Sequence, residues 1–238
     1  MWAINNLLER ERAIPAEQTQ IAPEAELEAI AEIVLTMSRR SDRSALQVEC
    51  DRVFVDRLKT NSQSLKTEFW EQHFEWKEVL EYPEVHGHVL DFGCGSGHLD
   101  VMLARRDCRI FGVDASPIGI ALANRVRESL AVQERLNFQE ADITRGNQTR
   151  LIFDSAISLH VFEHISEPGP IIGGLRQFVR ERGHLLVSVP YKNAYDDPGH
   201  VNHFYSGGDL KAFLAPHIKV HRVDLHTDTN VLKAVCQF

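Results

Sequence analysis

The middle of the chain alternates between short apolar runs and segments whose apolar residues recur at helical spacing. The apolar runs indicate strands, and the segments between them indicate amphipathic helices. Strands that alternate with helices in this way form a parallel sheet through right-handed crossovers. The expected strands cover residues 88–92, 109–114, 136–141, 152–159 and 183–190.

The C-terminal tail departs from this alternation. Two strand-like runs, at 218–225 and 231–236, flank the polar stretch 226–230. A short polar connection between two strand-like runs predicts a hairpin. We therefore expect the chain to end in a hairpin rather than in another strand and helix.

From Pro23 to about residue 84 the apolar residues follow helical spacing, and nothing in this segment alternates like a strand. Residues 1 to about 22 are expected to be loosely structured, with Pro15 and Pro23 as interruptions. Three amphipathic helices should follow, each with one apolar face. Those faces carry Leu27, Ile30, Ala31, Val34 and Leu35; Leu46, Cys50, Val53, Phe54 and Leu58; and Phe69, Trp70, Phe74, Trp76 and Leu80.

This change of pattern divides the chain into two predicted parts. Residues 1–84 form an N-terminal helical segment, and residues 85–238 form an α/β domain. The aromatic-rich third helix, at 69–80, is expected to pack against the sheet, because aromatic faces commonly build cores. A lid over the substrate is the second interpretation of that helix, and a homodimer surface is a further interpretation of the helical segment.

Composition narrows the class of protein. A chain of 238 residues is long enough to bury a sizeable core. The net charge of -8 disfavours a nucleic-acid partner, whose phosphates need a basic face. The four cysteines include no C-x-x-C pair, which indicates reduced thiols rather than a zinc knuckle or a disulfide framework. The chain starts without a secretory signal and has no apolar run of membrane-spanning length, so we expect a cytoplasmic protein.

The stretch 89–97 carries the most specific motif of the chain. An apolar run ends in the acid Asp91 and passes into three glycines, Gly93, Gly95 and Gly97. This order predicts a strand, a glycine turn and a helix, and glycines there let the backbone approach a ligand. The spacing is G-x-G-x-G, not the G-x-G-x-x-G of dinucleotide loops, and no Lys follows Gly97 as a phosphate cradle requires.

At these residues the chain resembles the class I S-adenosylmethionine-dependent methyltransferases, whose loop has the pattern acid-x-G-x-G-x-G. The resemblance covers about residues 85–238. It implies a Rossmann-like, doubly wound α/β fold with a mostly parallel seven-stranded sheet and a C-terminal antiparallel hairpin. It also implies S-adenosylmethionine as the cofactor and S-adenosylhomocysteine as the product.

The resemblance gives cofactor roles to acids that follow three of the strands. Asp91 would bond the loop amides and orient the cofactor's amino group. Asp114 would bond two ribose hydroxyls, since a carboxylate offers two oxygens, and Asp142 would meet the adenine amino group. Taken alone, each acid could instead be a helix cap or a turn residue. The predicted cofactor set is Asp91, Gly93, Cys94, Gly95, Gly97, Asp114, Ala115, Asp142, Ile143 and Leu159.

Histidines that follow the fourth and fifth strands are the candidate general bases. The stretch 158–165 resembles one that borders cofactor and acceptor in small-molecule methyltransferases, including those of quinone biosynthesis. The loop at 196–204 resembles a family loop that commonly lines the acceptor pocket. A histidine near neutral pKa can remove the acceptor proton, although each could equally serve the structure. The predicted catalytic set is His160, His164, His200 and His203.

Glu163, His164 and a loop histidine could also bind a divalent metal. The adjacent Glu and His resemble the metal-dependent methyltransferases of small RNA and some quinone precursors, whose pattern is Glu-x-x-Glu-His. His160 stands where the first Glu of that pattern should be. We therefore expect no metal cofactor, and a histidine-rich set would favour zinc or iron over magnesium.

The predicted activity is methyl transfer from S-adenosylmethionine to a small-molecule hydroxyl. Positioning would supply most of the catalysis, with a histidine assisting proton loss. N- and C-methyl acceptors stay open, because the cofactor motifs do not specify the acceptor. A non-catalytic binding or scaffold protein with the same fold is the alternative from another class, and the intact glycines and acids argue against it. The glycine spacing argues against a nicotinamide oxidoreductase.

Overall fold

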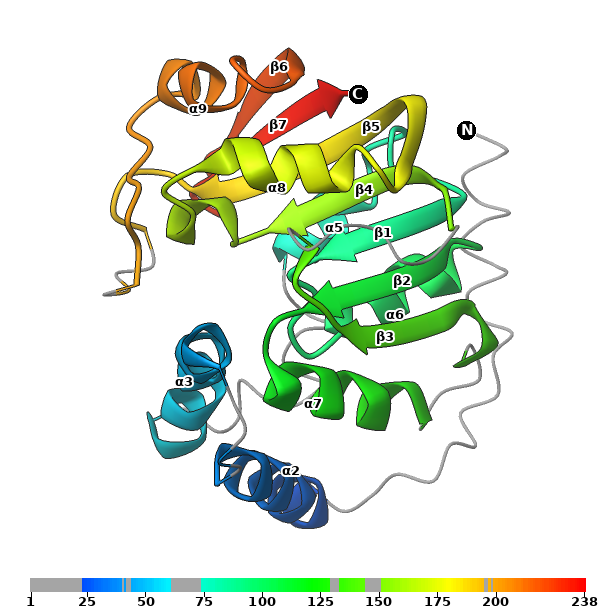
Figure 1. The fold of residues 1–238 in the computed structure, drawn as a ribbon, viewed down its shortest axis with the longest axis vertical. Coiled ribbons are helices and arrows are strands. Elements are labelled where there is room, and N and C mark those ends of the chain that lie inside the picture. The colour runs from blue at the N-terminus through cyan, green and yellow to red at the C-terminus, as the bar shows by residue number, and fades with distance from the viewer. Residues whose placement is uncertain are drawn as a thin grey trace.

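The computed structural model describes residues 23–39, 41, 44–60, 74–128, 133–143, 151–194, 197 and 199–238. Its centre is a seven-stranded sheet with the strand order β3-β2-β1-β4-β5-β7-β6 (Figure 1). The strands are β1 (His88–Phe92), β2 (Arg109–Asp114), β3 (Leu136–Glu140), β4 (Phe153–Leu159), β5 (Val179–Pro190), β6 (Lys219–His226) and β7 (Val231–Gln237). β1 to β5 pair in parallel, whereas β7 pairs antiparallel with β5 and β6. The expected α/β fold with a terminal hairpin is confirmed.

Helices precede, connect and follow these strands. Those described are α2 (Pro23–Ser38), α3 (Ala45–Thr60), α5 (Phe74–Val79), α6 (His98–Arg105), α7 (Pro117–Glu128), α8 (Pro168–Leu175) and α9 (Gly207–Leu214), with the 3-10 helices η3 (Gln133–Arg135) and η5 (Phe162–His164). α6 begins directly after the glycine loop, as the motif predicts. α7 begins after Ser116, whose hydroxyl accepts a hydrogen bond from Gly119 N at 2.9 Å and so caps the helix.

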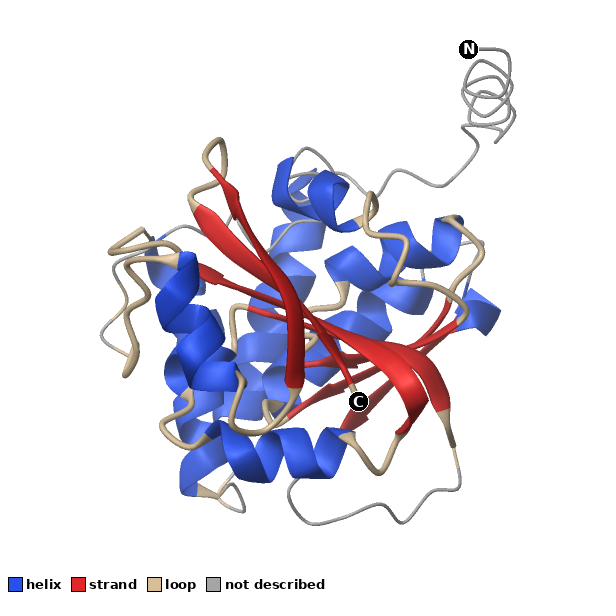
Figure 2. Ribbon diagram, turned by 90° about the horizontal axis from the view of Figure 1, so that it is seen from above, coloured by secondary structure: helices blue, strands red, loops and turns tan. Residues whose placement is uncertain are grey.

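Alternating side chains of the sheet build two cores, one on each face. Leu90 of β1 belongs to the core that α8 covers with Ile172. Its neighbour Val89 belongs to the other core, which α6 covers with Leu99 and Leu103. Neighbouring residues of a strand point to opposite faces, which explains this division. Figure 2 shows the twisted sheet with helices on both sides.

β1 and β2 have the predicted bounds, but β5 begins at Val179 instead of residue 183. Val179 pairs with Phe153 before the register of the two strands shifts. The residues that follow, 180–182, are charged and exposed. This first part of β5 therefore carries no apolar pattern from which a strand could be predicted.

The helices α2 and α3 pack against α7 rather than against the sheet. Their buried residues Ile30, Val34 and Phe54 meet Ile118 and Leu122 of α7. These contacts follow the predicted apolar faces of the two helices. In Figure 1 both helices lie beside α7, at the β3 edge of the sheet, with α3 toward the carboxyl ends of the strands.

α5 docks on the sheet itself, where Val79 joins the core on the α6 face. Of the predicted third helix, the structure describes Phe74–Val79. Phe69 and Trp70 of that helix lie outside the described residues, and so does the stretch 1–22. The division of the chain at residue 84 stays a prediction. Among the described residues, no helix is both long and apolar enough to cross a bilayer.

Candidate cofactor and acceptor site

The glycine loop follows β1 and connects it to α6. Gly93, Gly95 and Gly97 have φ values of +81°, +55° and +72°, which is the left-handed region that favours glycine. A Cβ added to Gly93 would lie 2.2 Å from Val161 Cγ2. The loop after β1 therefore directly contacts the segment after β4, because the two strands are neighbours in the sheet.

Asp114 lies at the end of β2 and faces the glycine loop. Its Oδ2 accepts a hydrogen bond from Gly95 N at 2.8 Å, and its Oδ1 accepts one from Ser116 N at 2.7 Å. Burial raises the pKa of Asp114 above its ordinary value, while these amide bonds act to lower it. Each carboxylate oxygen has two lone pairs, so each can accept one further hydrogen bond from a ligand.

The helix α3 covers this part of the site. Its buried Asp51 accepts hydrogen bonds from the Ser116 hydroxyl and from Ile118 N at the start of α7. Phe54, one turn further along α3, lies 3.8 Å from the position of a Cβ on Gly95. The Phe54 ring thus forms a wall beside the glycine loop, at contact distance from Gly95.

Asp91 lies beneath the loop, buried between β1 and α6. Its carboxyl group contacts that of Asp100, which is fully buried in the first turn of α6. Burial and the neighbouring Asp100 raise the pKa of Asp91 well above its ordinary value. Asp91 is therefore one half of a buried carboxyl pair, and its role toward the cofactor stays a prediction.

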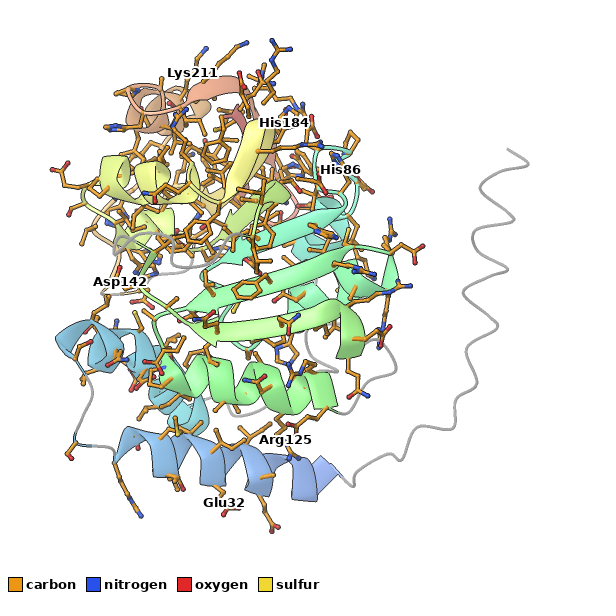
Figure 3. The ribbon with its side chains drawn as sticks, turned by 45° about the vertical axis from the view of Figure 1, so that its right-hand side comes forward. Glu32, His86, Arg125, Asp142, His184 and Lys211 are labelled. Atoms are coloured by element: carbon orange, nitrogen blue, oxygen red, sulfur yellow. The ribbon has the colours of Figure 1, made fainter. Side chains whose placement is uncertain are left out.

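The other predicted cofactor residues differ in how far their side chains are buried. The Cys94 thiol points inward, since its Sγ lies 2.8 Å from a Cβ position on Gly112, and Ile143 packs in the core near Gly174 of α8. Leu159 is buried at the end of β4, and Ala115 is half-buried after β2. Figure 3 shows Asp142 at the end of the sheet near α3, with His86 and His184 at the opposite end.

His160, directly after β4, is held between two buried carboxylates. Its Nε2 lies 2.7 Å from Glu75 Oε2, and its Nδ1 lies 3.3 Å from Glu163 Oε1. Burial acts to lower the pKa of His160, but Glu75 and Glu163 raise it to about 10. The ring is then an imidazolium, which has no lone pair to accept a proton. This arrangement argues against the predicted base role of His160.

The other predicted histidines form a cluster around Glu163. The ring centroids of His164 and His200 lie 4.8 Å apart, and those of His200 and His203 lie 6.3 Å apart. Glu163, His164 and His200 bring a carboxylate oxygen and two ring nitrogens within 4.8 Å of one another. Such a group has the donor types for a divalent ion, and the absence of a metal cofactor stays a prediction.

The two histidines of the closest pair differ in their surroundings. His164 Nδ1 lies 2.9 Å from the Gly199 carbonyl oxygen, which can only accept, so Nδ1 carries a hydrogen. His200 is half-buried, and burial lowers its pKa below the ordinary value although Glu163 acts to raise it. His203 is exposed. Of the four predicted bases, His200 is therefore the one that burial keeps neutral.

Backbone bonds hold the histidine loop against the segment after β4. The Glu163 carbonyl oxygen accepts hydrogen bonds from Val201 N and Asn202 N at 2.9 and 3.0 Å. Asp197 of the same loop pairs with Arg52 of α3 at 3.2 Å. The helix that covers the glycine loop therefore also contacts the loop that carries His200.

Three acids of this region were missed by sequence reasoning: Asp51, Glu75 and Asp100. Each lies on a helix, and each is at most 1% exposed. Asp51 interrupts the predicted apolar face between Cys50 and Phe54, which is the signal that could have identified it. A buried acid needs a partner in the folded protein, and the sequence does not name that partner.

A protein-family model described as a methyltransferase domain matches residues 83–230. The chain belongs to the methyltransferase domain family. Membership confirms the class I S-adenosylmethionine-dependent methyltransferase predicted from the glycine motif, and with it the expected cofactor.

Curated relatives include the ubiquinone biosynthesis O-methyltransferase of Acinetobacter baylyi, which is 25% identical over 146 residues, covering 55% of this chain and 60% of that protein. The mitochondrial ubiquinone biosynthesis O-methyltransferase of Schizosaccharomyces pombe is 32% identical over 103 residues, covering 42% of this chain and 37% of that protein. The chain thus matches roughly 40–60% of the length of these relatives.

Solved structures share the fold at low identity. A SAM dependent methyltransferase from Aquifex aeolicus aligns with a TM-score of 0.57 and 17% identity, over 68% of this chain and 89% of that one. The [4+2]-cyclase SpnF aligns with a TM-score of 0.59 and 15% identity, over 69% and 79%. Proteins named for such different reactions share this fold, so the fold does not specify the acceptor.

The residues around the glycine loop fit the family's cofactor. Asp114 keeps acceptor positions for two hydroxyl groups after bonding Gly95 and Ser116. Apart from the chain neighbours of Gly95, Phe54 Cζ at 3.8 Å is the one heavy atom of the described residues within 4 Å of a Cβ placed there. The three left-handed glycines leave the loop backbone without side chains, which lets a ligand approach it closely.

Proposed function

We propose that the chain transfers the methyl group of S-adenosylmethionine to a hydroxyl group of a small molecule, and that a phenol-like hydroxyl fits best. The observation that carries the proposal is the place of His200, half-buried and beside Glu163. Val161, between His160 and the Glu163–His164 pair, contacts Gly93. The histidine cluster and the glycine loop therefore adjoin at the same end of the sheet.

The cofactor would lie along the glycine loop under α3. Asp114 would accept hydrogen bonds from the two ribose hydroxyls, and Asp142 would meet the adenine amino group. Asp91 and the loop amides would hold the methionine end, and Phe54 would cover it. The cofactor supplies a methyl group on a positively charged sulfur, which becomes a neutral thioether when the methyl group leaves.

His200 would take the proton of the acceptor hydroxyl. Its lowered pKa leaves the ring neutral near pH 7, with a lone pair free to accept a proton. The hydroxyl oxygen forms its bond to the methyl carbon as the carbon–sulfur bond breaks, and the proton passes to His200. The Glu163 carboxylate beside the ring would stabilise the imidazolium that forms.

An imidazole base suits an acidic hydroxyl better than an alkyl alcohol. A phenolic hydroxyl has a pKa near 10, a few units above that of imidazole, so proton transfer in the transition state is within reach. The names of the curated relatives, ubiquinone biosynthesis O-methyltransferases, support oxygen as the acceptor atom. The net charge of -8 supports a small molecule over a nucleic acid.

Residues 1–84 would act as a cap on the domain formed by residues 85–238. Three neighbouring residues of α3 support this role. Asp51 bonds the start of α7, Arg52 pairs with Asp197 of the histidine loop, and Phe54 faces the glycine loop. The cap thus contacts both the cofactor side and the acceptor side of the site.

The test is a transfer assay with S-adenosylmethionine labelled in its methyl group. The acceptor panel contains catechol, phenol, a benzyl alcohol, an aniline and a transfer RNA. We expect the label in the methyl ethers of catechol or phenol, with one S-adenosylhomocysteine formed per ether. Label in the aniline alone, or in the RNA alone, would contradict the proposal. Binding of S-adenosylhomocysteine without transfer to any acceptor would favour the non-catalytic alternative.

A further inference from the structure

A closed ring of contacts joins Glu75, His160 and Ser188. Glu75 Oε2 lies 2.7 Å from His160 Nε2, and Glu75 Oε1 accepts a hydrogen bond from the Ser188 hydroxyl at 2.7 Å. The His160 backbone N–H donates to the Ser188 carbonyl oxygen at 2.9 Å. Glu75 therefore contacts the His160 ring and the Ser188 side chain, while the backbone of Ser188 in β5 holds the backbone of His160.

This ring holds His160 in an unusual conformation. Its φ is +56°, in the left-handed region that residues other than glycine seldom occupy. Such a conformation is strained and persists where surrounding contacts enforce it, which is common at functional sites. The contacts that enforce it here come from Glu75 on one side and β5 on the other.

The opposite edge of the His160 ring faces the proposed catalytic cluster. His160 Nδ1 lies 3.3 Å from Glu163 Oε1, and the Glu163 side chain is 2% exposed. Neither Glu163 oxygen has a hydrogen-bond partner of ordinary geometry in the part of the chain that the structure describes. On the far side of Glu163 lie His164 and His200. His160 therefore lies between the carboxylates of Glu75 and Glu163, at 2.7 and 3.3 Å.

The charges around this chain of contacts come from several elements. α5 supplies Glu75, and one turn later Glu78, which pairs with the buried Lys233 of β7 and with His226 of β6. Lys233 also lowers the pKa of Glu75, together with His160 and Ser188, against the effect of burial. Polar contacts thus anchor both ends of α5 to the sheet and place Glu75 firmly.

We propose that Glu75 is a positioning residue for methyl transfer, which through His160 holds the Glu163 carboxylate against the His164–His200 pair. This inference rests on the proposed function for its catalytic consequence. None of the hydrogen bonds and ion pairs of the described residues joins Glu75 to His200, so Glu75 would act through His160 and Glu163. Its removal should leave the glycine loop intact and misplace the carboxylate that stabilises the protonated base.

The experiment compares wild type with Glu75→Gln, Ser188→Ala and Glu84→Gln, as full chains with S-adenosylhomocysteine bound. The measurements are nitrogen-15 spectra of the histidine rings and steady-state kinetics on the hydroxyl acceptor. In Glu75→Gln we expect the ring signals of both His160 and His200 to move. We also expect kcat to fall about 10-fold or more, with KM for S-adenosylmethionine within about twofold, since a positioned base contributes of the order of 10²–10⁴-fold.

Glu84→Gln is the matched control, because it removes a carboxylate that pairs with Arg222 of β6 and contacts neither Glu75 nor His160 through any hydrogen bond or ion pair of the described residues. It should leave the His200 signals and kcat unchanged. Ser188→Ala removes one of the two contacts of Glu75 and should give the same changes as Glu75→Gln at smaller size. If Glu75→Gln does not fold, the ring signals and kcat of Ser188→Ala test the proposal in its place.

Unmoved His200 signals in both Glu75→Gln and Ser188→Ala would overturn the inference, and so would an equal loss of kcat in Glu84→Gln. A wild-type protein that transfers methyl to no acceptor would overturn the proposed function instead. The ring signals still decide the positioning in that case, since they need no turnover.

Discussion

The two halves of the site are built in different ways. The cofactor half, around Gly93, Gly95 and Asp114, is made of backbone turns that directly follow strands. The acceptor half is made of side chains from α5, η5, β5 and the loop at 197–203, which meet only when the sheet has formed. The first half depends on local sequence and the second on long-range packing, so substitutions should separate the two.

Replacing His200 with Ala should give the largest effect and should fall on the acceptor half alone. We expect kcat to drop by about 10²–10⁴-fold, because a general base contributes that much. Affinity for S-adenosylhomocysteine, measured by calorimetry, should stay within about twofold. His203→Ala is the control, since His203 is exposed and lies beyond His200. If His164→Ala abolishes turnover while His200→Ala does not, the base is His164.

Asp114→Ala should act on the cofactor half alone. Two hydrogen bonds to the ribose are lost, each worth about 0.5–1.5 kcal/mol net, so we expect the Kd for S-adenosylhomocysteine to rise about 5- to 150-fold. The matched control is Asp107→Ala, an exposed acid just before the other end of β2. An unchanged Kd in the Asp114 variant would remove this residue from the ribose role.

The pH dependence of stability should report on the acceptor half. The pKa of His160 is raised to about 10 from 6.5, so its stabilising contribution is complete below 6.5 and is lost as the pH rises toward 10. The pKa of Glu75 is lowered to about 2 from 4.5, so its contribution is complete above 4.5 and is lost as the pH falls toward 2.

Urea unfolding at about pH 6.5 and about pH 9 measures this contribution of His160. We expect wild type to lose about 1–3 kcal/mol more than Glu75→Gln between these two values, because each pKa unit is worth 1.4 kcal/mol. Equal losses in the two proteins would show that Glu75 does not raise the pKa of His160.

Arg52→Ala should give the smallest effect, because it removes only an ion pair between α3 and the histidine loop. The pair with Asp197 is partly exposed, with side-chain exposures of 37% and 33%, and such pairs contribute about 0–1 kcal/mol. We expect the unfolding free energy to change by less than about 1 kcal/mol and KM for the acceptor to rise a few-fold. A change in cofactor affinity larger than that in acceptor KM would place Arg52 in the cofactor half.

The contrast between the halves also explains what the sequence could predict. β1, the glycine loop and the acid after β2 are encoded by residues next to one another, and their predicted positions agree with the structure. The sequence predicts His160 as a general base because it is a histidine that directly follows the fourth strand. Its pKa depends on Glu75, which lies 85 positions earlier in the chain. No local pattern reveals such a partner, because buried pairs form through tertiary contacts.

The α3 wall has a consequence for the speed of turnover. Phe54 lies over the glycine loop, and Asp51 holds α3 to the first turn of α7 through two hydrogen bonds. With the cofactor in the proposed place under α3, the spent cofactor leaves past this wall only when those contacts open, so we expect product release to limit the rate once the acceptor is saturating. The residence time of S-adenosylhomocysteine would then be set by a helix that takes no part in the chemistry.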